Sequence, residues 1–230
     1  MSIATRYLRL REELDHCCLA CGRAPEDVLL LSVSKTVGVS EVREAVAVGA
    51  RAFGENRVDL LEEKHAALPE EAWHFIGNVQ SRKIPEIVAH ATLIHSVYKK
   101  QHIARISAAA ESRGKIQDIL LEVNISGEES KSGLTPDAVE DMVRYCGEFS
   151  HVRVRGLMTM APQGDKNAAI RCFTDLAALR DRLVVEVCPD VPRADLHELS
   201  MGMSEDWRYA IPWGATIVRI GRAVFDDAFE

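Results

Sequence analysis

Lys35 is the residue of this sequence that is best placed for covalent chemistry. It follows the mainly apolar run Val28–Val33, which is typical of a strand buried on both faces. An ammonium at the end of such a strand would be partly desolvated, which favours the neutral amine. A neutral amine condenses with an aldehyde to give a Schiff base. Since an isolated strand-end lysine usually only extends to solvent, this chemistry needs support from other residues.

A group of residues near the end of the chain is suited to binding a phosphate. The segment Ser200–Ser204 ends a predicted strand and leads into a short helix, where hydroxyl and backbone N–H groups suit a phosphate dianion. Gly221 ends the next strand and lets backbone amides approach a ligand closely. Simple N-capping is the alternative interpretation of the two serines. Together with Lys35, these residues indicate a cofactor that is anchored by its phosphate.

The elements that must position these residues alternate along the chain. Strands are expected near residues 28–35, 51–54, 73–77, 92–97, 117–125, 152–160, 195–201 and 216–221. Helices are expected near residues 39–49, 56–67, 80–89, 99–113, 135–148, 165–187 and 204–210. An extra amphipathic helix precedes them over Ile3 to Cys21. Eight strands predict a closed (β/α)8 barrel, although an open doubly wound sheet fits the alternation as well.

The barrel places the distinctive polar residues at one end. Active residues of such barrels lie at the carboxyl ends of the strands. The polar residues that fall there are Lys35, Glu55-Asn56, Gly77-Asn78, His95-Ser96, Asn124, Met158-Thr159, Ser200 to Ser204 and Arg219 to Arg222. No linker or change in composition divides the chain, so we expect one domain over residues 1–230.

Composition excludes several classes of function. The 230 residues carry a formal net charge of −7, which argues against nucleic-acid binding because phosphate backbones require clustered Lys and Arg. No apolar stretch is long enough for a membrane span, and the charged N-terminus is unlike a signal peptide. We therefore expect a cytoplasmic protein. Its six cysteines lack zinc-ligand spacing and are expected to be reduced thiols, so no metal site is predicted.

Eight segments, in order along nearly the whole chain, resemble the pyridoxal phosphate homeostasis proteins, whose barrel is similar to the N-terminal domain of bacterial alanine racemases. The segments are VSKT (33–36), FGENRV (53–58), WHFIGNVQSRK (73–83), IHSV (94–97), EVNISGEESKSGL (122–134), RGLMTMAP (155–162), LSMGMSEDW (199–207) and VRIGRAVF (218–225). The resemblance implies a single TIM barrel that binds pyridoxal 5′-phosphate (PLP).

The resemblance also implies the residues of the site. Lys35 matches the lysine that forms a Schiff base with PLP, and Arg219 matches the arginine that faces the pyridine nitrogen. Asn56 and His74 match recurrent polar positions near the cofactor. The other implied contacts are Ser200, Ser204, Gly221 and Arg222 around the phosphate, and Asn124 and Met158 beside the ring.

The chain departs from the family pattern at three positions. Family members usually continue VRIGxxxFG, whereas Asp226 follows Phe225 here, so a different C-terminal turn is expected. Asn78 and Arg222 also differ from the usual forms, which puts the role of Arg222 in question. None of these changes touches Lys35 or Arg219.

The implied function is storage and transfer of PLP without catalytic turnover, in the homeostasis of vitamin B6, with PLP-dependent apoenzymes as acceptors. A permanent cation such as Arg219 does not readily give its proton to the ring, so the ring stays a weak electron sink. A carboxylate partner would favour carbanion chemistry instead. The arginine therefore suits reversible holding of the aldehyde.

Two enzymatic alternatives remain open. A PLP-dependent amino-acid racemase needs a second acid/base, which alanine racemases take from a tyrosine of a separate C-terminal domain. That domain is expected to be absent here because the chain ends soon after the eighth strand, which also favours a monomer over a dimer. A barrel aldolase or phosphate-sugar enzyme using Lys35 needs a general acid/base, for which Glu55 is the candidate.

Overall fold

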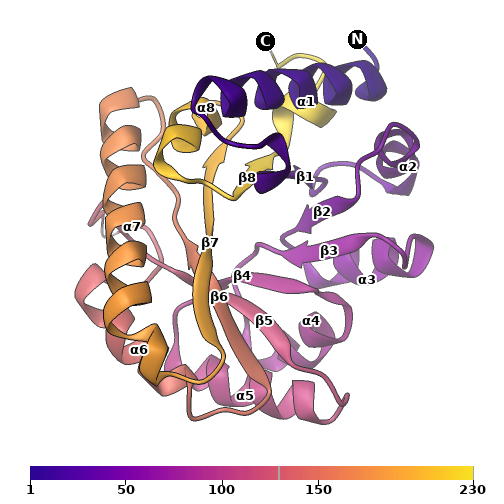
Figure 1. Ribbon diagram of the computed structural model, residues 1–230. Coiled ribbons are helices and arrows are strands. Elements are labelled where there is room, and N and C mark those ends of the chain that lie inside the picture. Colours follow the sequence, from indigo (N-terminus) through magenta and orange to yellow (C-terminus); the bar gives the residue numbers. More distant parts are fainter. Residues whose placement is uncertain (129, 230) are drawn as a thin grey trace.

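The computed structural model describes residues 1–128 and 130–229, and its central feature is a closed barrel of eight parallel strands (Figure 1). Each strand pairs with the next in chain order, and β8 pairs with β1 in a register that joins Leu31 to Arg219. Closure removes the open-sheet alternative. The strands are β1 Leu29–Val33, β2 Ala52–Glu55, β3 Ala72–Phe75, β4 Leu93–Val97, β5 Gln117–Glu122, β6 Val152–Met158, β7 Ala194–Met203 and β8 Ile217–Ile220.

Helices surround the barrel in the order that the sequence predicts, with one short helix, α9, that was not predicted. They are α1 Ile3–Ala20, α2 Val39–Ala47, α3 Val58–Ala67, α4 Ile84–His90, α5 Lys100–Glu111, α6 Val139–Cys146, α7 Lys166–Glu186, α8 Trp207–Ala210 and α9 Arg222–Phe225. Several strands are shorter than expected, since residues such as Lys35 and Gly77 lie in the connecting loops. No helix in the described part of the chain is long and apolar enough to cross a membrane.

The extra N-terminal helix closes the ring of helices. The hydroxyl of Ser2 caps α1 by accepting a hydrogen bond from the Thr5 backbone N–H at 3.2 Å. The predicted apolar stripe is buried, as the five residues Ile3, Tyr7, Leu10, Leu14 and Cys18 show. This face packs against α9 and α2, so α1 lies over the junction between β8 and β1, and both chain termini lie on its side of the barrel (Figure 1).

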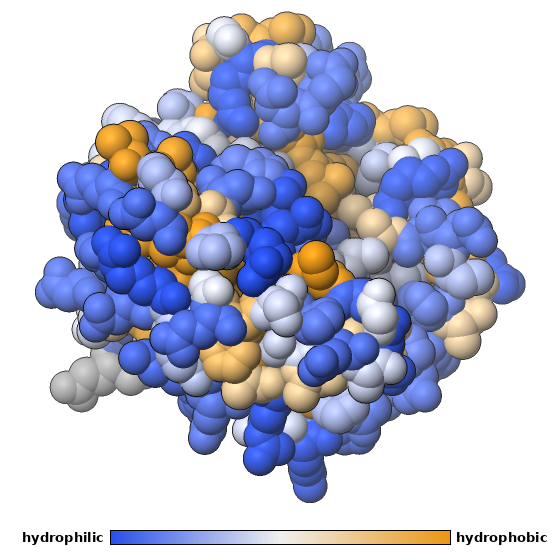
Figure 2. Space-filling view, turned by 60° about the horizontal axis from the view of Figure 1, so that its bottom comes forward, coloured by the Kyte–Doolittle hydropathy of each residue, from blue (hydrophilic) through white to orange (hydrophobic). Residues whose placement is uncertain are grey.

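Side chains alternate between two environments along the strands. Outward-facing residues such as Val218 and Ile220 join the large apolar layer beneath the helices. Residues that face inward from the strands form a smaller cluster inside the barrel, which comprises Leu31, Ala52, Leu93, Leu120, Met158 and Ile217. The outer surface is mostly hydrophilic on the face shown in Figure 2, which agrees with a sequence that is 27% charged.

Candidate functional site

Lys35 lies in the turn that follows β1, two residues beyond Val33, and is exposed. The preceding residue still belongs to the barrel rim, because the Ser34 backbone N–H donates to the carbonyl oxygen of Gly54 at 3.1 Å. The expectation that strand-end burial desolvates this lysine is therefore wrong. The chain turns away from the barrel before the lysine, which leaves the amine accessible at the carboxyl end of the strands.

A buried ion pair lies directly beside this turn. The ammonium of Lys64, on α3, donates to Glu55 Oε1 at 2.5 Å and to the carbonyl oxygen of Ser34 at 2.8 Å. The Ser34 hydroxyl donates to the same carboxylate oxygen at 2.6 Å. Glu55 is thus fully buried, with Oε1 held by this pair and Oε2 without a partner among the described residues, and a carboxylate shielded in this way is unsuited to act as the acid/base that the aldolase alternative requires. Lys64 was not singled out from the sequence because it falls within a helical pattern.

Arg219 extends from β8 into the barrel interior, where only 5% of the residue is exposed. One terminal nitrogen donates to the Ser200 carbonyl oxygen at 2.8 Å and to Ser200 Oγ at 2.7 Å, and the other donates to the Thr159 carbonyl oxygen at 2.9 Å. Burial lowers the pKa of Arg219 to about 10, so it remains a cation at neutral pH. Within residues 1–128 and 130–229, no carboxylate forms an ion pair with this guanidinium.

Ser200 lies deep in the barrel and accepts a hydrogen bond from Arg219. The residue is fully buried, and its Oγ lies 2.9 Å from Nδ1 of His95 as well as 2.7 Å from the guanidinium. In the described part of the chain the Ser200 hydroxyl is engaged with these two buried partners, and the expected contact of Ser200 with a phosphate stays a prediction. His95 continues the network, with Nε2 lying 2.9 Å from Nδ1 of His74.

Both histidines are neutral. Burial lowers the pKa of His74 to about 4. Burial, with smaller contributions from His74 and the Arg219 cation, holds the pKa of His95 well below its usual range. The sequence marked His74 as a recurrent polar position and His95 as a strand-end residue, but nothing in it indicated that the two rings touch each other.

The predicted phosphate segment comes together between β7 and α9. The Ser204 hydroxyl accepts a hydrogen bond from the Ala223 backbone N–H at 3.4 Å. Gly221 lies in front of β1, where a Cβ would stand 3.2 Å from the Val33 carbonyl oxygen. Its φ of −109° is ordinary, so close packing rather than a special backbone conformation accounts for glycine here.

Arg222 points away from this segment. It is exposed, forms an ion pair with Glu205 at 2.6 Å and lies over the Phe229 ring, 4.9 Å from its centre. Asp226, which departs from the family pattern, accepts a hydrogen bond from the Ala228 backbone N–H at 3.0 Å. This carboxylate therefore stabilises a C-terminal turn of its own, and Arg222 is engaged on the outer surface.

Asn56 and Asn124 occupy loops at the same end of the barrel. Asn56 is exposed after β2 and packs so closely on Gly77 that a Cβ there would lie 2.1 Å from the Asn56 carbonyl oxygen. The Asn124 amide donates to the carbonyl oxygens of Glu128 at 2.9 Å and Lys131 at 3.2 Å and accepts from the Gly127 backbone N–H at 3.1 Å. Its polar group therefore organises its own loop.

Two further residues line the barrel interior near Arg219. Met158, which the resemblance places beside a ring, is 3% exposed and belongs to the interior cluster. Glu122, at the end of β5, is 4% exposed. Burial raises the pKa of Glu122, and the nearby Arg219 cation opposes this shift. Glu122 was missed from the sequence, although it begins the quoted segment EVNISGEESKSGL.

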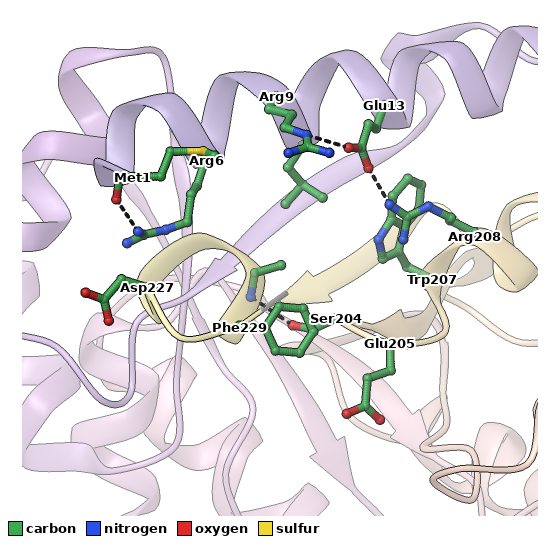
Figure 3. A pocket seen from close by; sticks show the side chains of 12 residues that line it. Met1, Arg6, Arg9, Glu13, Ser204, Glu205, Trp207, Arg208, Asp227 and Phe229 are labelled. Carbon is green, nitrogen blue, oxygen red and sulfur yellow. Dashed lines mark hydrogen bonds and ion pairs between the residues drawn. The ribbon is translucent and has the colours of Figure 1, made fainter.

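A cavity of about 750 Å³ lies beside the Ser204 segment, between the first turns of α1 and the C-terminal turn. Figure 3 shows that Arg9 and Arg208 both pair with Glu13 at its edge. Ser204 lines this cavity, whereas Lys35 and Arg219 do not. The candidate site is therefore at the carboxyl ends of the strands, and the cavity adjoins it on the side of Ser204 and Ala223.

The closed barrel is matched by a known domain family and by solved structures. The model of the alanine racemase N-terminal domain matches residues 20–228. PipY of Synechococcus elongatus, solved with PLP bound, has 32% sequence identity and a TM-score of 0.84, covering 97% of this chain and 100% of that chain.

Curated relatives define the family more narrowly. The pyridoxal phosphate homeostasis protein of Aquifex aeolicus is 37% identical over 230 residues, covering 99% of each chain. The protein of the same name from Vibrio cholerae is 35% identical over 235 residues, covering 98% of this chain and 96% of its own. This chain belongs to the pyridoxal phosphate homeostasis protein family.

Proposed function

We propose that this chain is a single barrel domain that binds PLP covalently through Lys35 and acts in PLP homeostasis without catalytic turnover. PipY, which shares its fold and 32% of its sequence, has been solved with PLP bound. Lys35 supports the assignment because its amine is exposed at the barrel mouth, where an aldehyde can reach it. When bound, PLP would supply an aldehyde to this amine and a pyridine ring to the barrel interior.

The observation that carries the proposal is the buried cation of Arg219. A guanidinium has five N–H groups, and the three bonds to Ser200 and Thr159 use three of them. No acceptor among the described residues takes the other two. A buried charge without a carboxylate is costly unless a ligand completes its hydrogen bonding. A pyridine nitrogen is a neutral acceptor that fits this requirement.

The contact between Arg219 and the pyridine nitrogen favours reversible binding of PLP over catalytic turnover. Even with its lowered pKa of about 10, Arg219 keeps its proton and donates only a hydrogen bond to the ring nitrogen. An unprotonated ring withdraws electrons weakly, so removal of a substrate α-proton gains little from it. We further propose that PLP-dependent apoenzymes receive the cofactor and that the protein works as a cytoplasmic monomer.

The phosphate is proposed to bind between the ends of β7 and β8. Ser204 offers a hydroxyl there, and the backbone turn after Gly221 offers N–H groups. Arg222 is left out of this contact because it pairs with Glu205 outside the segment. Asn56 and Met158 are proposed to contact the ring and its substituents, and Asn124 to shape the adjoining loop.

The test is covalent capture of the cofactor. Purified protein is incubated with PLP and reduced with borohydride, and the modified peptide is identified by mass spectrometry. Lys35→Ala should abolish the visible absorbance and the reduced adduct, whereas Lys115→Ala, in the turn before β5 at the opposite end of the barrel, should retain both. An adduct spread over several lysines, or a colourless wild type, would contradict the proposal.

Turnover is tested on the same sample. PLP-loaded protein is incubated with alanine or serine in deuterated water, and the α-proton is followed by NMR. We expect no exchange above that of free PLP. Exchange that depends on Lys35 would overturn the non-catalytic part of the proposal and favour the racemase alternative.

A further inference from the structure

A continuous chain of polar side chains crosses the interior of the barrel. It begins at Arg219 on β8, passes through Ser200 on β7 and His95 on β4, and ends at His74 on β3. The successive contacts measure 2.7 Å, 2.9 Å and 2.9 Å, and all four residues are at most 6% exposed. Its neighbours inside the barrel include the apolar Leu93 and Ile217.

The hydrogen bonds in this chain have one consistent direction. The guanidinium has no acceptor, so it donates to Ser200 Oγ. Ser200 then donates its single proton to Nδ1 of His95, which must be an acceptor. The neutral His95 ring therefore carries its proton on Nε2 and donates to Nδ1 of His74. The chain fixes one tautomer for each histidine.

A second direction is disfavoured by the surrounding charges. If His95 donated from Nδ1, the Ser200 proton would need another acceptor, and none of the described residues provides one. A doubly protonated His95 would place a second cation close to Arg219. The acidic groups that act on the guanidinium are Asp206 and Glu122, and neither forms an ion pair with it within residues 1–128 and 130–229.

We infer that Ser200, His95 and His74 are positioning residues that hold the Arg219 guanidinium in the orientation needed to meet the pyridine nitrogen. This inference deepens the proposed function and rests on it. Both N–H groups of one terminal nitrogen are fixed on Ser200, and the Thr159 carbonyl oxygen fixes the other terminal nitrogen. The remaining N–H groups are left on the opposite edge of the guanidinium, free to donate to a ligand.

The free-energy cost of burying these polar side chains supports a positioning role. Two neutral histidines and a serine are more expensive to bury than aliphatic side chains of similar volume, which make up the rest of the interior cluster. A hydrogen-bonded chain holds a guanidinium in one orientation, whereas aliphatic packing would let it turn or draw in a carboxylate.

The first experiment measures the tautomers directly, in the full-length protein labelled with 15N-histidine and freed of cofactor. NMR should show His95 and His74 each protonated at Nε2 and unprotonated at Nδ1 at neutral pH. A proton on Nδ1 of His95, or a charged ring, would overturn the inference. Because no cofactor takes part, this result does not depend on whether the protein binds PLP.

The second experiment follows the cofactor in variants of the chain. Ser200→Ala and His95→Phe should each speed the loss of PLP from Lys35 about tenfold or more and shift the absorbance maximum, because Arg219 loses its fixed orientation. His95→Asn should restore retention in part, since its amide oxygen can accept the Ser200 proton. Ser107→Ala, at a buried serine of α5 outside the barrel interior, is the matched control.

The variants separate the two proposals. Borohydride should still fix PLP on Lys35 in Ser200→Ala and His95→Phe. If the wild type itself gives no adduct, the proposed function is wrong, and the tautomer result is unaffected. Folding of each variant is checked by its thermal midpoint against the Ser107→Ala control. If folded Ser200→Ala and His95→Phe keep the wild-type spectrum and release rate, the positioning role is refuted.

Discussion

Lys64 and Glu55 form an ion pair of 2.5 Å in which neither side chain reaches solvent. The pair joins α3 to the end of β2, and its second bond, to the Ser34 carbonyl oxygen at 2.8 Å, reaches the end of β1. The residue after Ser34 is Lys35. The buried pair therefore fixes the stretch of backbone from which the candidate nucleophile extends, while Lys35 itself remains exposed.

Removing one member of this pair should be strongly destabilising. Lys64→Met leaves the Glu55 carboxylate buried without its cation, and we expect a loss of about 3–5 kcal/mol in the free energy of unfolding. The double variant Lys64→Met with Glu55→Gln should recover part of this loss, because no buried charge then remains. Urea unfolding of the two proteins checks this, and equal stability of Lys64→Met and wild type would contradict it.

Gly77→Ala should distort the loop that carries Asn56. The added Cβ would lie 2.1 Å from the Asn56 carbonyl oxygen, and backbone cannot yield as a flexible side chain would. We expect a loss of about 1–3 kcal/mol, together with weaker PLP retention. Gly164→Ala is the control, because its Cβ would meet nothing within 4 Å and only the positive φ of 78° opposes it. A larger loss in the control would refute the steric explanation.

Stability should fall as the pH drops from about 6.5 to about 4. Unfolding returns the pKa of His74 from about 4 to its ordinary value of 6.5, so the unfolded state binds the proton more readily throughout this window. At roughly 1.4 kcal/mol per pKa unit, His74 accounts for a loss on the order of 3 kcal/mol, and above pH 6.5 its contribution is complete. His95 acts in the same direction.

This pH dependence is measured by urea unfolding at a series of pH values. His74→Phe should flatten the curve between pH 6.5 and 4, whereas His16→Gln, on the exposed face of α1, should leave it unchanged. A His74→Phe curve with the wild-type slope would show that the buried histidine pair does not set the acid sensitivity.

Asn124→Ala should loosen the loop that follows β5. The side chain makes bonds to Glu128, Lys131 and Gly127, and alanine replaces none of them. We expect faster amide hydrogen exchange at these positions and a loss of about 1–2 kcal/mol in stability. Ser132→Ala, at an exposed residue of the same loop, is the control. Unchanged exchange in Asn124→Ala would contradict this organising role.

The sequence alone determined the alternation of strands and helices, the N-terminal helix with its apolar stripe, and the end of the barrel at which polar residues gather. These features follow from local patterns: apolar runs bury both faces of a parallel strand, and steps of three and four place Ile3, Tyr7 and Leu10 on one side of a helix. The family resemblance pointed further, to Lys35 and Arg219.

Only the tertiary structure decided which of these polar groups meet. Pairing of β7 with β8 brings Arg219 to Ser200, and the curvature of the barrel brings Ser200 to His95 on β4, 105 positions away in sequence. The same packing assigned Ser200 to the guanidinium, paired Glu55 with Lys64, and left Lys35 exposed. Local patterns carry no information on such partners, because hydrogen bonds across a barrel depend on strand register and on which face each residue presents.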